Sequence, residues 1–174
     1  MSINVESLDV NLERDGFVRS LLSHLTGVLQ DTVGIEESRG FISIVGQVMG
    51  EEINKIYKNA LSLDKLPREI LSQVLIDLKK RIQGDFYVIS EDNNKIVFGN
   101  RKCPFAEKVL DRPSLCQMTT NVFGMIASDC AGYAKVNIEQ AIANGDNECR
   151  VTVYLNPEGK DCSTSPGREF ISEI

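Results

Sequence analysis

The hydrophobic period of the chain changes at Gly84, and this change limits the possible fold more than any other feature of the sequence. Before it, apolar residues recur every three or four positions, which is the spacing of amphipathic helices. After it, short segments rich in β-branched and aromatic residues alternate with turn residues, and one further helical pattern lies between them. Helices followed by neighbouring strand pairs predict an α+β domain.

Three helices are predicted in the first half of the chain, over residues 17–29, 35–61 and from about residue 66 to residue 82. Gly34 is expected to end the first of them. The second contains Gly46 and Gly50, and a glycine inside a helix costs about 1 kcal/mol relative to alanine. We therefore expect another helix to cross this one closely at the two glycines, since a close crossing would offset that cost.

Two hairpins and one helix are predicted in the second half. The first hairpin covers residues 85–100, with the turn "EDNN", and the second joins "YAKVNI" to "CRVTVYL" through a turn around Gly145. A helix from Ser114 to near Gly132 lies between the hairpins. The predicted fold has N-terminal helices packed on an antiparallel sheet of about four strands. Residues 1–156 are expected to form one domain, and residues 157–174, which are rich in proline and glycine, a flexible tail.

Charge and motif content exclude several classes of function. A net charge of −6 over 174 residues opposes binding to a phosphate backbone, so we expect no direct contact with nucleic acid. No apolar run approaches the length of a membrane span and the first residues do not resemble a signal peptide, which predicts a cytoplasmic protein that does not contact membranes. With one histidine and no catalytic motif, the chain is not expected to be an enzyme.

Five cysteines are the most distinctive candidates for a site. Cys103 and Cys116 flank a proline-containing loop, Cys149 opens a strand, and Cys130 is a further candidate. Cys116 falls in the first turn of a predicted helix, where the helix dipole is expected to lower the pKa of its thiol. No Cys-x-x-Cys pair is present, so spacing alone also allows the cysteines to be small buried apolar residues.

A second candidate site is an apolar pocket between sheet and helices. Aromatic residues and methionine are common in the walls of small-molecule pockets. We predict that Phe86, Phe98, Phe123 and Met125 line such a pocket.

The segments "NRKCPF", "PSLC" and "ANGDNEC", with the sequence around them from about Phe17 to Leu155, resemble the methanogen output domain, which is similar to vinyl-reductase-type or hydrocarbon-binding sensory domains. The resemblance implies a regulatory α+β domain of prokaryotic signalling that forms a homodimer and acts on a signalling partner. It places motif cysteines at Cys103, Cys116 and Cys149.

Two functions follow from the resemblance and the residues together. In the first, the cysteine cluster binds zinc or an iron–sulfur centre, or senses redox state. In the alternative, the domain is free of metal and binds a small molecule in its apolar pocket, or serves as a scaffold for protein interaction.

Overall fold

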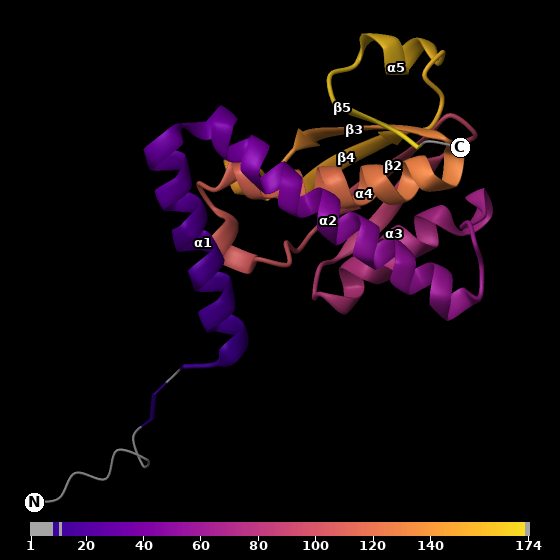
Figure 1. The fold of residues 1–174 in the computed structure, drawn as a ribbon. Helices are drawn as coiled ribbons and strands as arrows, with labels where there is room; N and C mark the ends of the chain where they lie inside the picture. The colour runs from indigo at the N-terminus through magenta and orange to yellow at the C-terminus, as the bar shows by residue number, and fades with distance from the viewer. Residues whose placement is uncertain (1–8, 11, 173–174) are drawn as a thin grey trace, which may run out of the picture.

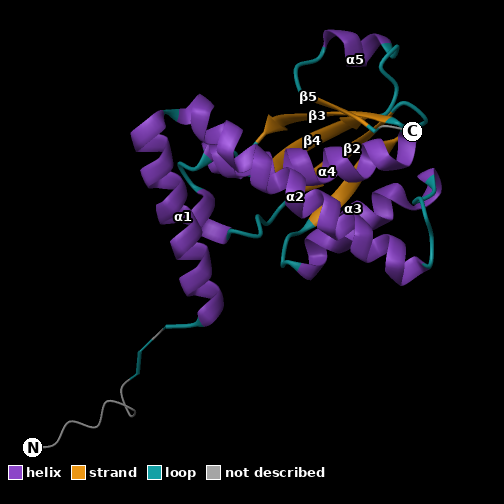
Figure 2. Ribbon diagram, in the orientation of Figure 1, coloured by secondary structure: helices purple, strands orange, loops and turns teal. Residues whose placement is uncertain are grey.

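The computed structural model describes residues 9–10 and 12–172, which form helices layered on one antiparallel sheet (Figures 1 and 2). The helices are α1 (Arg14–Val33), α2 (Ile35–Leu61), α3 (Leu71–Arg81), α4 (Cys116–Ala131) and α5 (Lys160–Thr164), with short 3-10 helices η2 (Arg68–Ile70), η3 (Ala106–Val109), η4 (Pro113–Leu115) and η5 (Ile142–Asn144). The strands are β1 (Phe86–Glu91), β2 (Lys95–Asn100), β3 (Tyr133–Gln140), β4 (Cys149–Tyr154) and β5 (Arg168–Ile171). The predicted α+β class is confirmed.

Every strand pair of the sheet is antiparallel, and the strand order is β1-β2-β4-β3-β5. The two predicted hairpins, β1–β2 and β3–β4, are present. They join through β2 and β4, where Phe98 lies opposite Val151. This central pair makes one continuous sheet from two hairpins that are far apart along the chain.

The segment that was predicted to be a flexible tail instead contributes α5 and a fifth strand. Residues Arg168–Ile171 pair with Tyr133–Val136 of β3. Phe170 is buried while Ile171 is exposed, which is the alternation of a strand with one covered face. The ring of Phe170 lies against Gly124 of α4, where any side chain would collide with it. This contact between distant residues holds a strand of only four residues, too short to stand out in the sequence.

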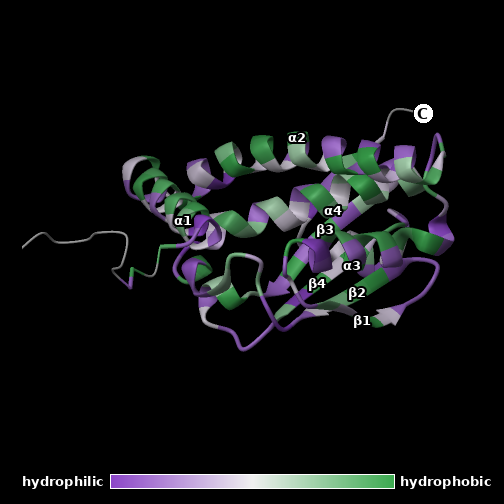
Figure 3. Cartoon of the chain, turned by 90° about the horizontal axis from the view of Figure 1, so that it is seen from below, coloured by the Kyte–Doolittle hydropathy of each residue, from purple (hydrophilic) through white to green (hydrophobic). Residues whose placement is uncertain are grey.

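The close helix crossing predicted at Gly46 and Gly50 is confirmed. A Cβ atom on Gly46 would lie 2.9 Å from the Cβ of Asn121, and one on Gly50 would lie 2.9 Å from the Cβ of Met125, both on α4. Figure 3 shows the result as layers, with α2 over α4 and α4 over the strands. The glycines therefore set how near α2 lies to the rest of the domain.

Much of the apolar surface of α1 and α2 is exposed, although the amphipathic pattern alone would suggest that it is buried. The exposed large apolar side chains of these helices, which we call the α1–α2 apolar face, are Phe17, Val18, Leu21, Leu22, Leu25, Val28, Ile35, Phe41, Ile44, Val45, Val48, Met49, Ile56 and Leu61. Figure 3 shows hydrophobic residues along both helices. None of the helices that the structure describes is both long and apolar enough to span a bilayer.

Candidate functional site

An apolar cavity of about 570 Å³ lies between the helices, the start of β4 and the segment that leads from β2 to α4. Its walls include Leu22, Met49, Phe86, Met118, Val122 and Ile138. Leu22 and Met49 are exposed, so the cavity reaches the surface between α1 and α2. Its volume falls within the range of about 300–1,000 Å³ that is usual for small-molecule sites.

Three of the predicted site cysteines line this cavity. Cys103 comes from the segment after β2, Cys116 from the start of α4 and Cys149 from the start of β4. The fourth candidate, Cys130, lies at the other end of α4 in the main core. Within the ranges that the structure describes, no group of three or more histidine, cysteine or acidic side chains is placed to hold a metal ion.

Two of the cavity thiols, those of Cys103 and Cys116, are in surroundings that keep them neutral. Burial raises the pKa of Cys116 to about 12, and burial also raises the pKa of Cys103. The prediction that the helix N-terminus lowers the pKa of Cys116 is wrong, because loss of solvent around the thiol outweighs the helix dipole. Cys149 accepts a hydrogen bond at its Sγ from the Ile142 amide over 3.4 Å.

The predicted aromatic pocket is only partly formed by the residues named for it. Phe86 lines the apolar cavity. Phe98 and Phe123 are fully buried in the core, where their rings meet edge to face with centroids 5.4 Å apart. Met125 faces a different depression, near the C-terminal end of α2. Two of the four residues therefore fill the core instead of lining a cavity.

Lys79 is a functional candidate that sequence reasoning missed. The Lys79 residue is only 4% exposed and lines the cavity. Its Nζ donates a hydrogen bond to Thr119 Oγ1 over 2.8 Å. Burial lowers the pKa of Lys79 to about 8. The available signal was its position four residues after Leu75, which places it on the buried face of α3.

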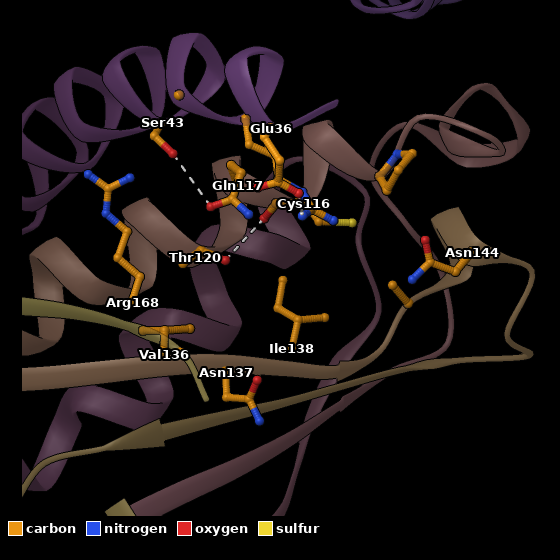
Figure 4. A pocket seen from close by; sticks show the side chains of 15 residues that line it. Glu36, Ser43, Cys116, Gln117, Thr120, Val136, Asn137, Ile138, Asn144 and Arg168 are labelled. Carbon is orange, nitrogen blue, oxygen red and sulfur yellow. Dashed lines mark hydrogen bonds and ion pairs between the residues drawn. The ribbon is translucent and has the colours of Figure 1, made fainter. Parts of the chain in front are cut away.

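A second, polar pocket lies on the other side of Cys116, between the first half of α2, α4 and β3 (Figure 4). Its volume is about 440 Å³. Its side chains are engaged with one another: Glu36 pairs with Arg39 over 2.6 Å, and Ser43 lies 3.5 Å from Gln117. Cys116 lines both cavities.

The cysteine loop (residues 103–116) is connected to α1 by polar contacts as well as to the cavity. Arg112 Nε donates to the Ser23 carbonyl over 3.0 Å, and its guanidinium covers Gly27, where a side chain would collide with it. Gln30 accepts a hydrogen bond from the Ser114 hydroxyl over 2.6 Å. The loop therefore forms a wall of the cavity on one side and holds α1 on the other.

The model of one protein family, methanogen output domain 1, matches residues 21–154. The chain belongs to the methanogen output domain 1 family. In this methanogen output domain, the matched residues include the cysteine loop, all three cavity cysteines and Lys79. No curated protein matches the chain.

Solved structures with the same fold include two proteins of distant sequence. One is the phenol-responsive sensory domain of the transcription activator PoxR with phenol, which is 16% identical, with 88% of this chain and 80% of that chain covered and a TM-score of 0.67. The other is a trafficking protein particle complex subunit 3 from Naegleria fowleri covalently bound to palmitic acid. Its sequence is 11% identical, the match covers 80% of this chain and 96% of that chain, and the TM-score is 0.53. At these identities the comparison shows only that this methanogen output domain has the same fold as the two proteins.

Proposed function

We propose that this methanogen output domain is a sensory and regulatory domain that binds a small organic molecule in its apolar cavity. The observation that carries the proposal is the cavity itself, which has a suitable volume, largely apolar walls and an opening at the surface. Its role is binding and not catalysis.

Two solved structures with the same fold are evidence for an organic ligand. One solved structure contains phenol and another is covalently bound to palmitic acid, and both molecules have a mainly apolar body. A metal or redox centre at the cysteines has less support, because no group of three or more histidine, cysteine or acidic side chains in the described part of the chain is placed to hold a metal ion. We therefore favour a role for the cysteines as part of the cavity wall.

The cysteine loop is the proposed route from the cavity to the surface. Cys103, Phe105 and Val109 of this loop line the cavity, while Arg112 holds α1. Ala106 and Asp111 adopt positive φ angles of 50° and 59°, a conformation that is strained for residues other than glycine. A ligand that displaces the loop would therefore shift α1, which gives the two-state element that a sensor requires.

The partner surface in this proposal is the α1–α2 apolar face, covered by a second copy of the chain. Large apolar side chains left exposed on two neighbouring helices are typical of protein interfaces. Because Leu22, Val45 and Met49 belong to this face and also line the cavity, dimerisation would cover the cavity opening. Ligand occupancy and association would then be coupled through the same side chains.

A titration with 1-octanol, followed by calorimetry, tests the binding function. We expect saturable binding to the wild-type chain and at least about tenfold weaker binding to Met49→Trp, because the indole would occupy the cavity opening. Ile56→Trp is the matched control, since Ile56 is exposed on the same helix but does not line the cavity. Equal affinity for the two variants would contradict a site in this cavity.

A further inference from the structure

Lys79 is a cation enclosed in the apolar cavity without an opposite charge beside it. The other charged side chains of the wall are paired: Arg19 with Asp15 over 2.5 Å, and Arg81 with Asp77 over 2.6 Å. Among the residues that the structure describes, no carboxylate lies within 4 Å of the Lys79 ammonium. A buried charge of this kind is unfavourable unless a counter-charge joins it.

The surroundings of the ammonium hold it in one place. Its Nζ lies 5.2 Å from the ring centroids of both Phe86 and Phe123, in addition to its hydrogen bond with Thr119. An ammonium has three protons to donate, so the bond to Thr119 leaves further donors. The Thr119 hydroxyl accepts that bond and still has its own proton to donate. The two groups together form a fixed cluster of donors.

Other polar groups of the cavity can also donate a hydrogen bond to an acceptor group on a ligand. The Asn100 side-chain amide lines the cavity, and its Nδ2 has only a long contact of 3.6 Å with Cys149 Sγ, which is a weak acceptor. The thiols of Cys103 and Cys116 are protonated and add no negative charge. The Asn100 Nδ2 and these two thiols are thus donors, in the cavity that also holds the Lys79 ammonium.

We propose that the cavity selects a small monocarboxylate, with the apolar body against the cavity walls and the carboxylate at the Lys79 ammonium and the Thr119 hydroxyl. This inference rests on the proposed function, because it names the class of ligand for the same cavity. A carboxylate would supply the counter-charge that Lys79 lacks, and charge-assisted hydrogen bonds are the strong ones. The same arrangement would reject an organic cation of equal size.

Three eight-carbon probes that differ only in the head group test the selection: octanoate, 1-octanol and octylammonium. For the wild-type chain at neutral pH we expect octanoate to bind about 10- to 100-fold more tightly than 1-octanol, because a hydrogen bond to a charged group is stronger than a neutral one. Octylammonium should bind most weakly. Calorimetric titration measures all three affinities on the same protein.

Lys79→Met removes the ammonium and keeps a side chain of similar length. We expect this variant to lose the preference for octanoate while it still binds 1-octanol. Lys80→Met is the matched control, because Lys80 is the next residue of α3 and is exposed, and it should keep the wild-type order. If Lys79→Met does not fold, Lys79→Gln replaces it, and the order measured on the wild-type chain tests the proposal without any variant.

The outcomes separate the two proposals. Binding of 1-octanol that equals or exceeds that of octanoate, with no effect of Lys79→Met on either, would overturn the carboxylate assignment and leave the apolar site in place. A folded wild-type chain that binds none of the three probes would contradict both the site and its selectivity.

Discussion

At the scale of single residues, burial decides the charge state of the side chains in the cavity. Lys79 and Cys116 both lie where water is excluded, so the charged form of each is disfavoured. For the lysine this lowers the pKa to about 8, and for the cysteine it raises the pKa to about 12. The cavity therefore contains a neutral thiol at Cys116 and an amine at Lys79 that titrates close to physiological pH.

The lowered pKa of Lys79 makes stability depend on pH. In the folded chain Lys79 loses its proton near pH 8, but in the unfolded chain it keeps the proton to about pH 10.5, so the unfolded state binds more protons between these values. The free energy of unfolding of the wild type, relative to Lys79→Met, should therefore rise by about 1 kcal/mol between pH 8 and pH 9. Urea denaturation at each pH measures it. If the difference in the free energy of unfolding between the wild type and Lys79→Met stays flat or falls over this pH range, Lys79 is not buried as described.

The raised pKa of Cys116 predicts slow alkylation. Only the thiolate reacts rapidly with iodoacetamide, so Cys116 in the folded chain should react at least about tenfold more slowly at pH 8 than in the urea-unfolded chain. Mass spectrometry of the peptide that contains Cys116 measures the rate in both states. A folded chain that reacts faster than the unfolded one would restore the idea of a thiolate cluster.

At the scale of elements, two close contacts position the cavity walls. Gly46 and Gly50 allow α2 to lie against α4, and Gly27 of α1 accepts the guanidinium of Arg112 from the cysteine loop. Each contact joins segments that are distant in sequence. The first holds one helix of the cavity in place, and the second links the loop to the α1–α2 apolar face.

Gly46→Ala should destabilise the domain. Its Cβ would lie 2.9 Å from the Asn121 Cβ and 3.2 Å from the backbone oxygen of Gln117, and overpacking of this kind costs about 1–3 kcal/mol. Gly40→Ala in the same helix is the control: it meets nothing within 4 Å, so it should stabilise the helix by about 0.5–1 kcal/mol. Denaturation midpoints of both variants measure the difference. The same sign of change for both would argue against the close crossing.

Arg112→Ala should release α1 from the cysteine loop. The variant loses the hydrogen bond to the Ser23 carbonyl, so we expect faster amide hydrogen exchange throughout α1 with no change in α4. Lys108→Ala is a control in the same loop, because Lys108 pairs only with its neighbour Glu107, over 3.7 Å, among the contacts described. Unchanged exchange in α1 of Arg112→Ala would remove the proposed route from the cavity to the surface.

Local patterns were enough to predict most of the elements, because helix and strand periods depend on neighbouring residues. The long helix over residues 35–61 and both hairpins needed nothing more. The fifth strand depends on tertiary packing, which no local pattern encodes, whereas the burial of Lys79 follows from the helical period of α3. The three cysteines of the cavity are far apart in the sequence, and that they line one cavity with apolar walls could not be predicted before the fold brought those walls around them.

At the scale of the whole molecule, the α1–α2 apolar face is the feature that a single chain leaves unexplained. It lies on α2, which is on the side of α4 away from the strands, and on α1, which lies beside the start of α2 (Figures 1 and 3). A second copy would cover it, and would close the cavity at the same time. The domain would then act as a dimer whose interface includes the opening of the ligand site.

Ile44→Glu should weaken this dimer. Ile44 is 64% exposed on α2, and a carboxylate there would be desolvated in an apolar interface. Ile89→Glu on β1 is the matched control, since Ile89 is also an exposed isoleucine but lies outside this face. Sedimentation velocity should show a dimer for the wild type and for Ile89→Glu, and a monomer for Ile44→Glu. A monomeric wild type at high concentration would exclude the dimer.

The most direct test of the ligand site is to locate a bound molecule by NMR. With 1-octanol in a sample of isotopically labelled chain, we expect intermolecular NOEs from the alkyl protons to the methyl groups of Met118 and Val122, which line the cavity, and none to Ile89. Contacts restricted to the outer surface of α1 and α2, with none inside the cavity, would contradict the account of this domain as a sensor of small organic molecules.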